Sequence, residues 1–297
     1  MGPNKIVVIG GALVDVRATT GARWIPDRSL PGSVRLTAGG AARNVAVDLA
    51  HLGHPVTLLI VTGDDPFGEW LVRRTSACGV DVAHVLSRPQ ATGLFVTVGP
   101  EGGETWSIAG AGPAEAVVPS DLEPWRATIT GAAVVASDAN FLEPVQEALA
   151  GLAASVPRVL LATSPHKAAR LRTVLAGAAV LVCNRAEALA LTGLPDTLGW
   201  QALGTALLIE GVDRVVMTHG PGGIAVLTAD EALIVPAPEV TVVDSTGAGD
   251  AVAAIAVHAL LAGLSSADTA ALAAAAAAVV VQSDETTPPE LAAVVRS

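Results

Sequence analysis

Short apolar segments typical of strands alternate with longer segments typical of helices through the middle of this 297-residue chain. Residues 132–137, 158–163 and 179–183 are rich in valine, leucine and alanine. The stretches between them, 143–154 and 167–177, have the length and composition of helices. Such alternation is typical of a parallel sheet with helices on both faces. The sequence therefore predicts an α/β protein with three layers and a mostly parallel central sheet.

Composition limits the classes of partner. The chain is 51% hydrophobic, so it can bury a large core, and its length fits one or two domains. The formal net charge of −11 argues against binding to nucleic acid or to a membrane surface, since both favour a basic face. An anionic substrate would then be held by local hydrogen-bond donors.

The most informative segment is VVDSTGAGD at residues 242–250, which runs into a long uncharged stretch. It predicts a strand at 240–243, a tight glycine turn at 247–249 and a buried helix at 251–264. The first amide groups of a helix lack partners within it, and with the helix dipole they stabilise negative charge on oxygen. Asp250 would lie beside this anion site, where a carboxylate can accept the proton of an attacking hydroxyl. The segment predicts phosphoryl transfer, although an aspartate that only caps a helix fits the same pattern.

The pattern DSTGAGDA closely resembles the C-terminal signature of the ribokinase-like (PfkB-type) carbohydrate kinases. The resemblance implies an ATP-dependent phosphotransferase that uses Mg²⁺, with Asp250 as the catalytic base. The residues implied to form the anion hole are Gly247, Ala248 and Gly249. Asp244 and Thr246 are implied to contact a monovalent cation such as K⁺.

Lysine is nearly absent, since only Lys5 and Lys167 occur. A Walker A loop needs a lysine on the phosphates, and a protein kinase needs a strand lysine and an HRD-type loop; the sequence contains neither pattern. The phosphates would then be bound by backbone amides, magnesium and arginine. His166 and Lys167 follow a predicted strand end, where they could face the phosphates, but we interpret both as surface residues.

A second segment, TAGGAARNVAVDLAHLG at residues 37–53, reads as a glycine pair followed by an amphipathic helix. By itself it fits a strand-to-helix turn without a ligand. It resembles the N-terminal signature of the same family, in which the glycines and the asparagine contact the phosphate acceptor. The resemblance therefore implies acceptor contacts for Gly39, Gly40 and Asn44.

The segment KIVVIGGALVDV at residues 5–16 reads as a strand that enters a glycine pair. A dinucleotide-binding turn would continue as G-x-G-x-x-G into a helix, whereas the residues after Gly11 are typical of a strand. In the resembled family this region ends in an aspartate that binds two acceptor hydroxyls, which implies that role for Asp15. Leu13 replaces the asparagine that the family commonly has, which bears on the choice of acceptor.

The motif NRAE, with Asn184 and Glu187, follows a predicted strand at the sheet edge where ligands of open α/β folds bind. The letters alone fit a helix N-cap followed by an acidic residue in the first turn. The family has an NxxE motif at the same place. It implies that Glu187, supported by Asn184, organises Mg²⁺ through water near the ATP phosphates.

The segment VVMTHGPGGIAV at residues 215–226 reads as strand, glycine turn and strand. It resembles the nucleotide-binding segment of the family, and the implied ATP contacts are Thr218, Gly220 and Gly223. The adenine pocket is implied to form beside the alanine-rich run that ends AVVVQSDE, where small side chains leave room for a base. The candidates there, chosen at helical spacing, are Ala275, Val279 and Ser283.

Two stretches, at 15–36 and 91–108, are rich in glycine, threonine and alternating apolar residues, with GPEGGE at 99–104 as a hairpin turn. We interpret them as a small β-lid over the acceptor site, as in the resembled family, within one domain that spans 1–297. A lid excludes water, which would otherwise compete as acceptor. Because family members often pair through their lids, a homodimer through the lid is a further hypothesis.

The sequence predicts neither a disulfide framework nor a zinc site, because Cys78 and Cys183 are far apart and the histidines are scattered. No signal peptide is predicted. The two longest uncharged stretches, 251–267 and 269–283, are shorter than a membrane span. We expect them to be core helices of a cytoplasmic protein.

The acceptor is suggested by the residues around the N-terminal signature. Arg43 directly before Asn44, with the later order SDAN, TSP and VCNRAEALALTG, looks most like the pseudouridine kinase branch, which phosphorylates a ribosyl 5′-hydroxyl. Trp106 on the predicted lid is a candidate to stack on the base, although core packing is the commoner role of a strand tryptophan. Two alternatives stay open. One is a kinase for a free sugar of the ribose, fructose or 2-keto-3-deoxygluconate type, and the other is a catalytically silent nucleoside- or sugar-binding protein.

Overall fold

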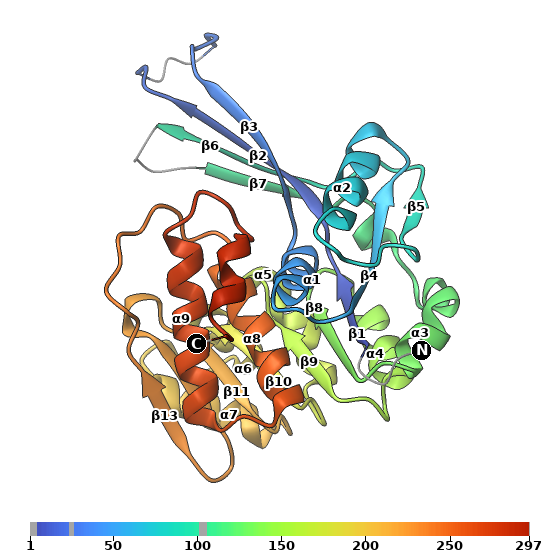
Figure 1. Cartoon of the computed structure of the whole chain (residues 1–297). Coiled ribbons are helices and arrows are strands. Elements are labelled where there is room, and N and C mark those ends of the chain that lie inside the picture. The colour runs from blue at the N-terminus through green and yellow to red at the C-terminus, as the bar shows by residue number, and fades with distance from the viewer. Residues whose placement is uncertain (1–4, 24–26, 101–105, 297) are drawn as a thin grey trace.

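The computed structural model describes residues 5–23, 27–100 and 106–296 (Figure 1). Within these ranges the chain forms a nine-stranded sheet in the order β13-β12-β11-β10-β9-β8-β1-β4-β5 and a four-stranded sheet in the order β3-β2-β6-β7. The strands of the large sheet are β1 Ile6–Gly10, β4 Val56–Gly63, β5 Leu86–Arg88, β8 Val134–Asp138, β9 Arg158–Leu161, β10 Val180–Asn184, β11 Val215–Thr218, β12 Ile224–Leu227 and β13 Ala232–Val235. Neighbours are parallel except that β12 runs antiparallel to β11 and to β13. The predicted α/β fold with a mostly parallel sheet is confirmed.

Helices cover both faces of the large sheet. They are α1 Ala41–His51, α2 Pro66–Ser76, α3 Arg126–Thr130, α4 Glu143–Leu152, α5 Pro165–Ala168, α6 Arg185–Thr192, α7 Trp200–Ile209, α8 Ala248–Ala262 and α9 Ser266–Val281. Because strand side chains alternate, Ile6 and Val8 of β1 pack in one core with α1, α8 and α9. Val7 and Ile9 pack in another core with α3 and α4. A third core joins the sheet to α6 and α7.

The alanine-rich helices α8 and α9 belong to the core, as predicted. Residues 251–257 of α8 are all buried, and their small side chains allow a close approach to the sheet and to α9. In the described part of the chain, no helix is long and apolar enough to cross a membrane. Cys78 and Cys183 are both free.

The four-stranded sheet forms a lid that projects from the body of the molecule (Figure 1). Its strands are β2 Leu13–Thr20, β3 Ser33–Gly39, β6 Leu94–Pro100 and β7 Trp106–Gly110. They overlap the predicted lid segments at 15–36 and 91–108; β2, β3 and β7 extend slightly beyond these bounds, and β6 lies within them. The predicted hairpin turn at 99–104 falls largely on residues 101–105, which lie outside the described residues.

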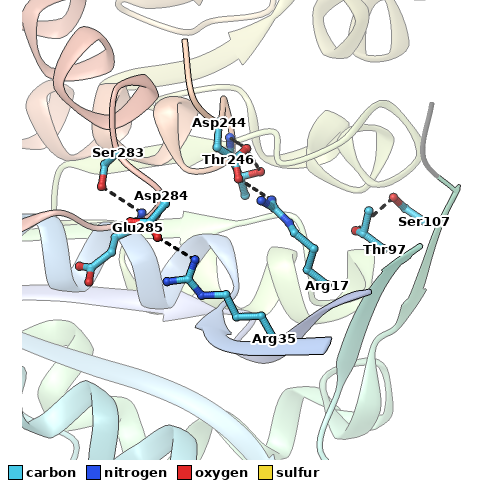
Figure 2. Close-up of polar contacts among 9 residues, drawn as sticks. All are labelled: Arg17, Arg35, Thr97, Ser107, Asp244, Thr246, Ser283, Asp284 and Glu285. Atoms are coloured by element: carbon cyan, nitrogen blue, oxygen red, sulfur yellow. Dashed lines mark hydrogen bonds and ion pairs between the residues drawn. The ribbon is translucent and has the colours of Figure 1, made fainter. Parts of the chain in front are cut away.

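The two faces of the lid differ in chemistry. Register pairs across the sheet join Arg35 to Arg17, Arg17 to Thr97 and Thr97 to Ser107, so these side chains share one polar face. Figure 2 shows them in one row, with Arg17 and Arg35 reaching toward the C-terminal part of the chain. The opposite face is apolar and exposed, and includes Val34, Leu36, Trp106 and Ile108. Trp106 therefore lies on the face opposite to Asp15 and Arg17. It cannot stack on a base bound at the acceptor site of the same chain, so that prediction is wrong.

The segment before α8 differs from the prediction in two ways. Residues 240–243 do not form a strand, because the amide of Val243 donates to the carbonyl oxygen of Val281, the last residue of α9, instead of to a neighbouring strand. In addition, α8 begins at Ala248, three residues earlier than predicted, so Ala248 and Gly249 form its first turn and only Gly247 precedes it. The predicted strand–turn–helix is therefore an extended loop that leads directly into the helix.

Candidate active site

The start of α8 is open toward solvent. Gly247 is the N-cap residue, with a φ of 87° that favours glycine. A Cβ at Gly247 would lie 2.4 Å from the backbone oxygen of Thr286, so a larger residue does not fit. No side chain in the described ranges caps this helix end, and a Cβ at Gly249 would meet none of their atoms within 4 Å. The amide groups and the dipole of α8 therefore face a space where an anion can bind.

Asp250, the third residue of α8, contacts α1. Its Oδ2 accepts a hydrogen bond of 2.8 Å from Asn44 Nδ2. Burial raises the pKa of Asp250 to about 7, and the bond from Asn44 opposes that rise. The nearby carboxylates of Asp138, Asp15 and Glu187 raise it further. A carboxyl group with a pKa near neutrality is suited to accept a proton from a hydroxyl.

The paired glycines before α1 bring the start of this helix close to β2 and to the loop that precedes it. A Cβ at Gly39 would lie 2.1 Å from Asp15 Oδ2, and a Cβ at Gly40 would lie 2.6 Å from the Cα of Ala12. Gly40 also has a φ of 99°, which favours glycine. Burial raises the pKa of Asp15 to about 6, against the opposing charges of Arg43 and Arg17. The predicted acceptor residues Asp15, Gly39, Gly40 and Asn44 therefore lie at one end of α1.

Arg43 fixes the orientation of the Asn44 amide. Its guanidinium is buried and donates to Asn44 Oδ1 at 3.1 Å and to the Ala38 carbonyl at 3.2 Å. Because Oδ1 accepts from Arg43, the Nδ2 group of Asn44 is the donor that meets Asp250. Arg43 therefore orients the Asn44 amide so that its NH₂ group donates to Asp250.

Asp138, at the end of β8, is a buried carboxylate that sequence reasoning missed. Its Oδ2 accepts from the amides of Gly11 at 2.9 Å and Ala42 at 3.1 Å, and so joins the loop after β1 to the start of α1. Asn140 completes the cluster, with its amide nitrogen 2.9 Å from Asp138 Oδ1. The sequence signal was a polar pair, SDAN, directly after an apolar strand.

Lys167 is bound to this cluster and is not a simple surface residue, which corrects the prediction. Its Nζ donates to Asn140 Oδ1 at 2.6 Å, and its side chain is half-buried. His166 is exposed, as predicted. The sequence did not reveal the contact because residues 140 and 167 follow different strands.

A pocket of about 200 Å³ lies at the carboxyl ends of β9, β10 and β11, beside the start of α8. Ligands of open α/β sheets bind at this edge. Pockets for whole drug-sized ligands enclose about 300–1,000 Å³, so this one has room for a phosphate group and a hydrated cation but not for a whole nucleotide. Five of the predicted site residues line it together: Asn184, Glu187, Thr218, Gly249 and Asp250.

Asn184 and Glu187 form a capping box at the start of α6. Asn184 Oδ1 accepts from the Glu187 amide at 2.9 Å, and Glu187 Oε2 accepts from the Asn184 amide at 2.8 Å. Burial raises the pKa of Glu187, while the bonds from Asn184 oppose this. The capping and the ligand interpretations are compatible, because the cap holds the Glu187 carboxylate at the pocket wall.

The pocket suits Mg²⁺ held mainly by water and phosphate. Among the described residues, no group of three or more His, Cys, Asp or Glu side chains could hold a metal ion. Mg²⁺ usually keeps several waters and binds through one or two carboxylates plus substrate phosphates. Glu187 supplies one carboxylate of this kind.

Thr163 is a second residue that sequence reasoning missed. Its φ of 51° is rare for a β-branched residue and costs on the order of 1–3 kcal/mol. Its buried hydroxyl has no hydrogen-bond partner among the described residues, and it lines the pocket. A strained residue with an unpaired hydroxyl is expected where a ligand completes the bonding.

The remaining nucleotide candidates lie farther along the same edge. Gly220 has open space around it, whereas a Cβ at Gly223 would lie 1.9 Å from the Val235 carbonyl oxygen. Gly223 is thus explained by packing against β13. Ala275 and Val279 are half-buried on α9 beside the core, and the Ser283 hydroxyl accepts from the Glu285 amide at 2.9 Å after this helix. These three candidates do not line the described pocket.

Asp244 and Thr246, the candidates for a monovalent cation, contact each other in the loop before α8. Asp244 Oδ1 accepts from the amide of Thr246 at 2.9 Å and from its hydroxyl at 2.8 Å. Asp244 Oδ2 accepts from the guanidinium of Arg17, which reaches down from the lid (Figure 2). The carboxylate of Asp244 is therefore bound on both oxygens.

An open helix start that can bind phosphate, beside a carboxylate able to take up a proton, is suited to move a phosphoryl group onto a hydroxyl. The fold and the site define an ATP-dependent phosphotransferase with an alcohol group as acceptor. The chain belongs to the pfkB family of carbohydrate kinases, whose family model matches residues 3–293.

Individual relatives agree with this assignment. The chain is 31% identical over 269 residues to the uncharacterized sugar kinase YeiI of Escherichia coli K12, covering 89% of this chain and 74% of the relative. It is 28% identical over 269 residues to the pseudouridine kinase of the same organism, covering 89% and 83%. Its structure is similar to that of Arabidopsis thaliana ribokinase complexed with ribose and ATP, with a TM-score of 0.86, 25% identity and coverage of 100% and 98%. Ribokinase homologues bind ATP and Mg²⁺. The chain is therefore a sugar or nucleoside kinase of this family.

Proposed function

We propose that this chain transfers the γ-phosphoryl group of ATP to the 5′-hydroxyl of a ribosyl nucleoside, with pseudouridine as the preferred acceptor. The observation that carries the proposal is the hydrogen bond of 2.8 Å between Asn44 and Asp250. It joins the helix that binds the acceptor to the residue that would act as base. The 28% identity to a pseudouridine kinase supports this choice of acceptor.

The acceptor would bind between α1 and the lid. Asp15, with a pKa of about 6, would accept hydrogen bonds from two ribosyl hydroxyls, and a carboxylate is a strong acceptor for such bonds. Gly39 and Gly40 let the sugar approach the backbone, because neither carries a side chain. Asn44 would contact the acceptor as well as Asp250.

Asp250 would take the proton of the attacking hydroxyl as that oxygen bonds to phosphorus. The amides of Gly247, Ala248 and Gly249 would then stabilise the negative charge on the transferred group. Because a base with a pKa of about 7 is largely ionised above neutrality, Asp250 is available at physiological pH. The lid would exclude water from the attacking position.

Magnesium ATP supplies the phosphoryl group and neutralises its charge when it is bound. Glu187, fixed by Asn184, would hold the cation through water, and the Thr163 hydroxyl would bond to a phosphate oxygen or to a water of the cation. Thr218 and Gly220 would lie along the nucleotide, with Gly223 in the same turn. Ala275, Val279 and Ser283 stay candidates for the adenine pocket.

Phe95 supports an acceptor that carries a base. It pairs in register with Asp15, so both side chains lie on the polar face of the lid. An aromatic ring on this face offers a flat surface on which a nucleobase could stack beside the ribose site. Phe95, and not Trp106, is therefore the proposed stacking residue.

The acceptor panel that tests this proposal measures ATP consumption with magnesium for pseudouridine, uridine, adenosine, inosine, ribose, fructose and 2-keto-3-deoxygluconate. Turnover confined to pseudouridine is the expected result. Turnover on ribose alone would show that the acceptor is a free sugar and not a nucleoside. Ligand-induced thermal stabilisation without turnover on any acceptor would favour the silent binding protein.

A homodimer through the lid is the proposed assembly of this single kinase domain. Val34 is 70% exposed and Ile108 is 73% exposed on the apolar face of the lid. A second copy of the same face would remove these side chains from water. Ile108→Glu is expected to yield a monomer in sedimentation analysis if the wild-type chain is a dimer.

A further inference from the structure

Two lid arginines contact two loops beside the start of α8. Arg17 on β2 and Arg35 on β3 lie directly opposite each other in register, and both reach toward the C-terminal part of the chain (Figure 2). Arg17 forms an ion pair with Asp244, and Arg35 forms one of 2.7 Å with Asp284. The lid is therefore tied by charge to both loops.

The two loops are in direct contact with each other. A Cβ at Gly247 would lie 2.4 Å from the Thr286 oxygen, and the amide of Val243 donates at 2.7 Å to the carbonyl oxygen of Val281, the last residue of α9 before the second loop. Asp244 precedes the N-cap residue Gly247 by only three positions. A charge placed at Asp244 therefore acts on the backbone that forms the anion hole.

The carboxylate of Asp244 is charged, and Arg17 of the same chain supplies the opposite charge. Burial acts to raise its pKa, but the two bonds from Thr246 and the guanidinium of Arg17 outweigh burial, so the pKa lies below its ordinary value. Its side chain is 18% exposed, whereas Asp284 is 63% exposed. The Arg17 pair is therefore sheltered only on the Asp244 side, since Arg17 itself is 47% exposed, whereas both members of the Arg35 pair are more than half exposed.

These contacts do not fit a monovalent cation bound by the Asp244 carboxylate. Oδ1 of Asp244 already accepts two hydrogen bonds and Oδ2 accepts one from Arg17, so the carboxylate has little capacity left for a cation. Such a cation would also lie beside the guanidinium, whose like charge repels it. The K⁺ site expected at Asp244 and Thr246 is therefore not supported by the side chains around it.

We infer that the guanidinium of Arg17 takes the place of a monovalent cation at Asp244, so that the lid itself supplies the positive charge to the anion-hole loop. The inference rests on the proposed function. Asp15 precedes Arg17 by two residues and shares its face of β2. An acceptor bound to Asp15 would hold the strand that carries Arg17 and so steady the ion pair that Arg17 already forms with Asp244.

The test measures the Kd of a non-hydrolysable ATP analogue with Mg²⁺ by calorimetry, in KCl and in tetramethylammonium chloride at equal ionic strength. The wild-type Kd is expected to agree in the two salts within about twofold. Arg17→Met is expected to weaken binding about five- to tenfold in tetramethylammonium, with partial recovery in KCl or on addition of guanidinium. Arg17→Lys keeps the charge, so it is expected to stay insensitive to K⁺.

Arg35→Met is the matched control, because Arg35 has the same register and lid face but an exposed ion pair. It is expected to bind the analogue like the wild type in both salts within about twofold. Thermal unfolding of each variant checks that it is folded. The inference is overturned if K⁺ strengthens wild-type binding severalfold, or if Arg17→Met binds like the wild type in both salts. The assay contains no acceptor, so a wrong choice of acceptor leaves its result unchanged.

Discussion

Asn44 Nδ2 donates a hydrogen bond of 2.8 Å to Asp250 Oδ2, although 206 positions separate the two residues in the chain. One residue comes from the helix that follows the glycine pair, and the other from the first turn of α8. The bond lowers the pKa of Asp250 against the larger effect of burial. It therefore couples the proposed acceptor site to the protonation of the proposed base.

The pH dependence of kcat/KM should report the ionisation of Asp250. Below its pKa of about 7 the carboxyl group is protonated and cannot act as base, so the rate is expected to rise with pH and level off above that value. Asn44→Ala removes the bond that lowers this pKa, so the midpoint is expected to move to higher pH. The midpoint is the readout, because Asn44 is also a proposed acceptor contact and its loss could change the rate for that reason alone. If the midpoint is the same in both proteins, the hydrogen bond from Asn44 does not affect the pKa of the catalytic base.

Asp250→Asn is expected to make the protein more stable above neutrality. The folded-state pKa of about 7 lies above the ordinary 3.8, so the folded protein binds the proton more tightly than the unfolded chain. Native stability therefore falls as pH rises from about 4 to about 7, and the variant lacks this loss. We expect a Tm at pH 8 about 2–4 °C above the wild type, with a smaller difference at pH 5. Equal melting curves at both pH values would count against a buried Asp250 carboxylate with a raised pKa.

Gly247 and Gly249 should respond differently to alanine. A Cβ at Gly247 would collide with the Thr286 oxygen at a φ of 87°, so Gly247→Ala is expected to lose on the order of 1–3 kcal/mol of stability as well as activity. A Cβ at Gly249 meets none of the described atoms within 4 Å but would point into the proposed phosphate site. Gly249→Ala is expected to melt like the wild type while kcat/KM falls about 10-fold or more. Full activity of Gly249→Ala would mean that the transferred phosphoryl group does not bind beside Gly249.

Phe95→Ala should weaken the binding of nucleosides more than that of free sugars. Stacking on a base contributes about 1–3 kcal/mol, so KM for a nucleoside is expected to rise about 5- to 150-fold while KM for ribose changes little. Trp106→Ala is the comparison, because Trp106 lies on the opposite face of the lid. An equal loss for both acceptors would mean that Phe95 only supports the lid.

The sheet and the glycine turns were predictable because local patterns determine them. Residues 132–193 alternate in a way that is typical of a parallel sheet, and the structure gives Gly247 a φ of 87°, which favours the glycine found there. The extended loop at 240–243 was not predictable, because β-branched residues favour any extended backbone and only the tertiary fold offers Val281 as the partner of Val243.

The contacts within the site could not be predicted from local patterns. Asp138 and Lys167 join segments that are far apart in sequence, and nothing near either residue indicates its partner. The family resemblance indicated Asn44 and Asp250 separately, but not the bond between them. The direction of a lid side chain depends on strand register, which is why Trp106 was favoured before Phe95.

The most direct test of this account compares Asp250→Asn with the wild type in turnover and in binding. The account predicts that kcat with the best acceptor falls about 10²–10⁴-fold, because the base is lost. Binding of the acceptor and of the ATP analogue, measured by calorimetry, should change little because Asn keeps the shape of the side chain and can bond to Asn44. Unchanged turnover in a folded Asp250→Asn protein would contradict the role of Asp250 as the base.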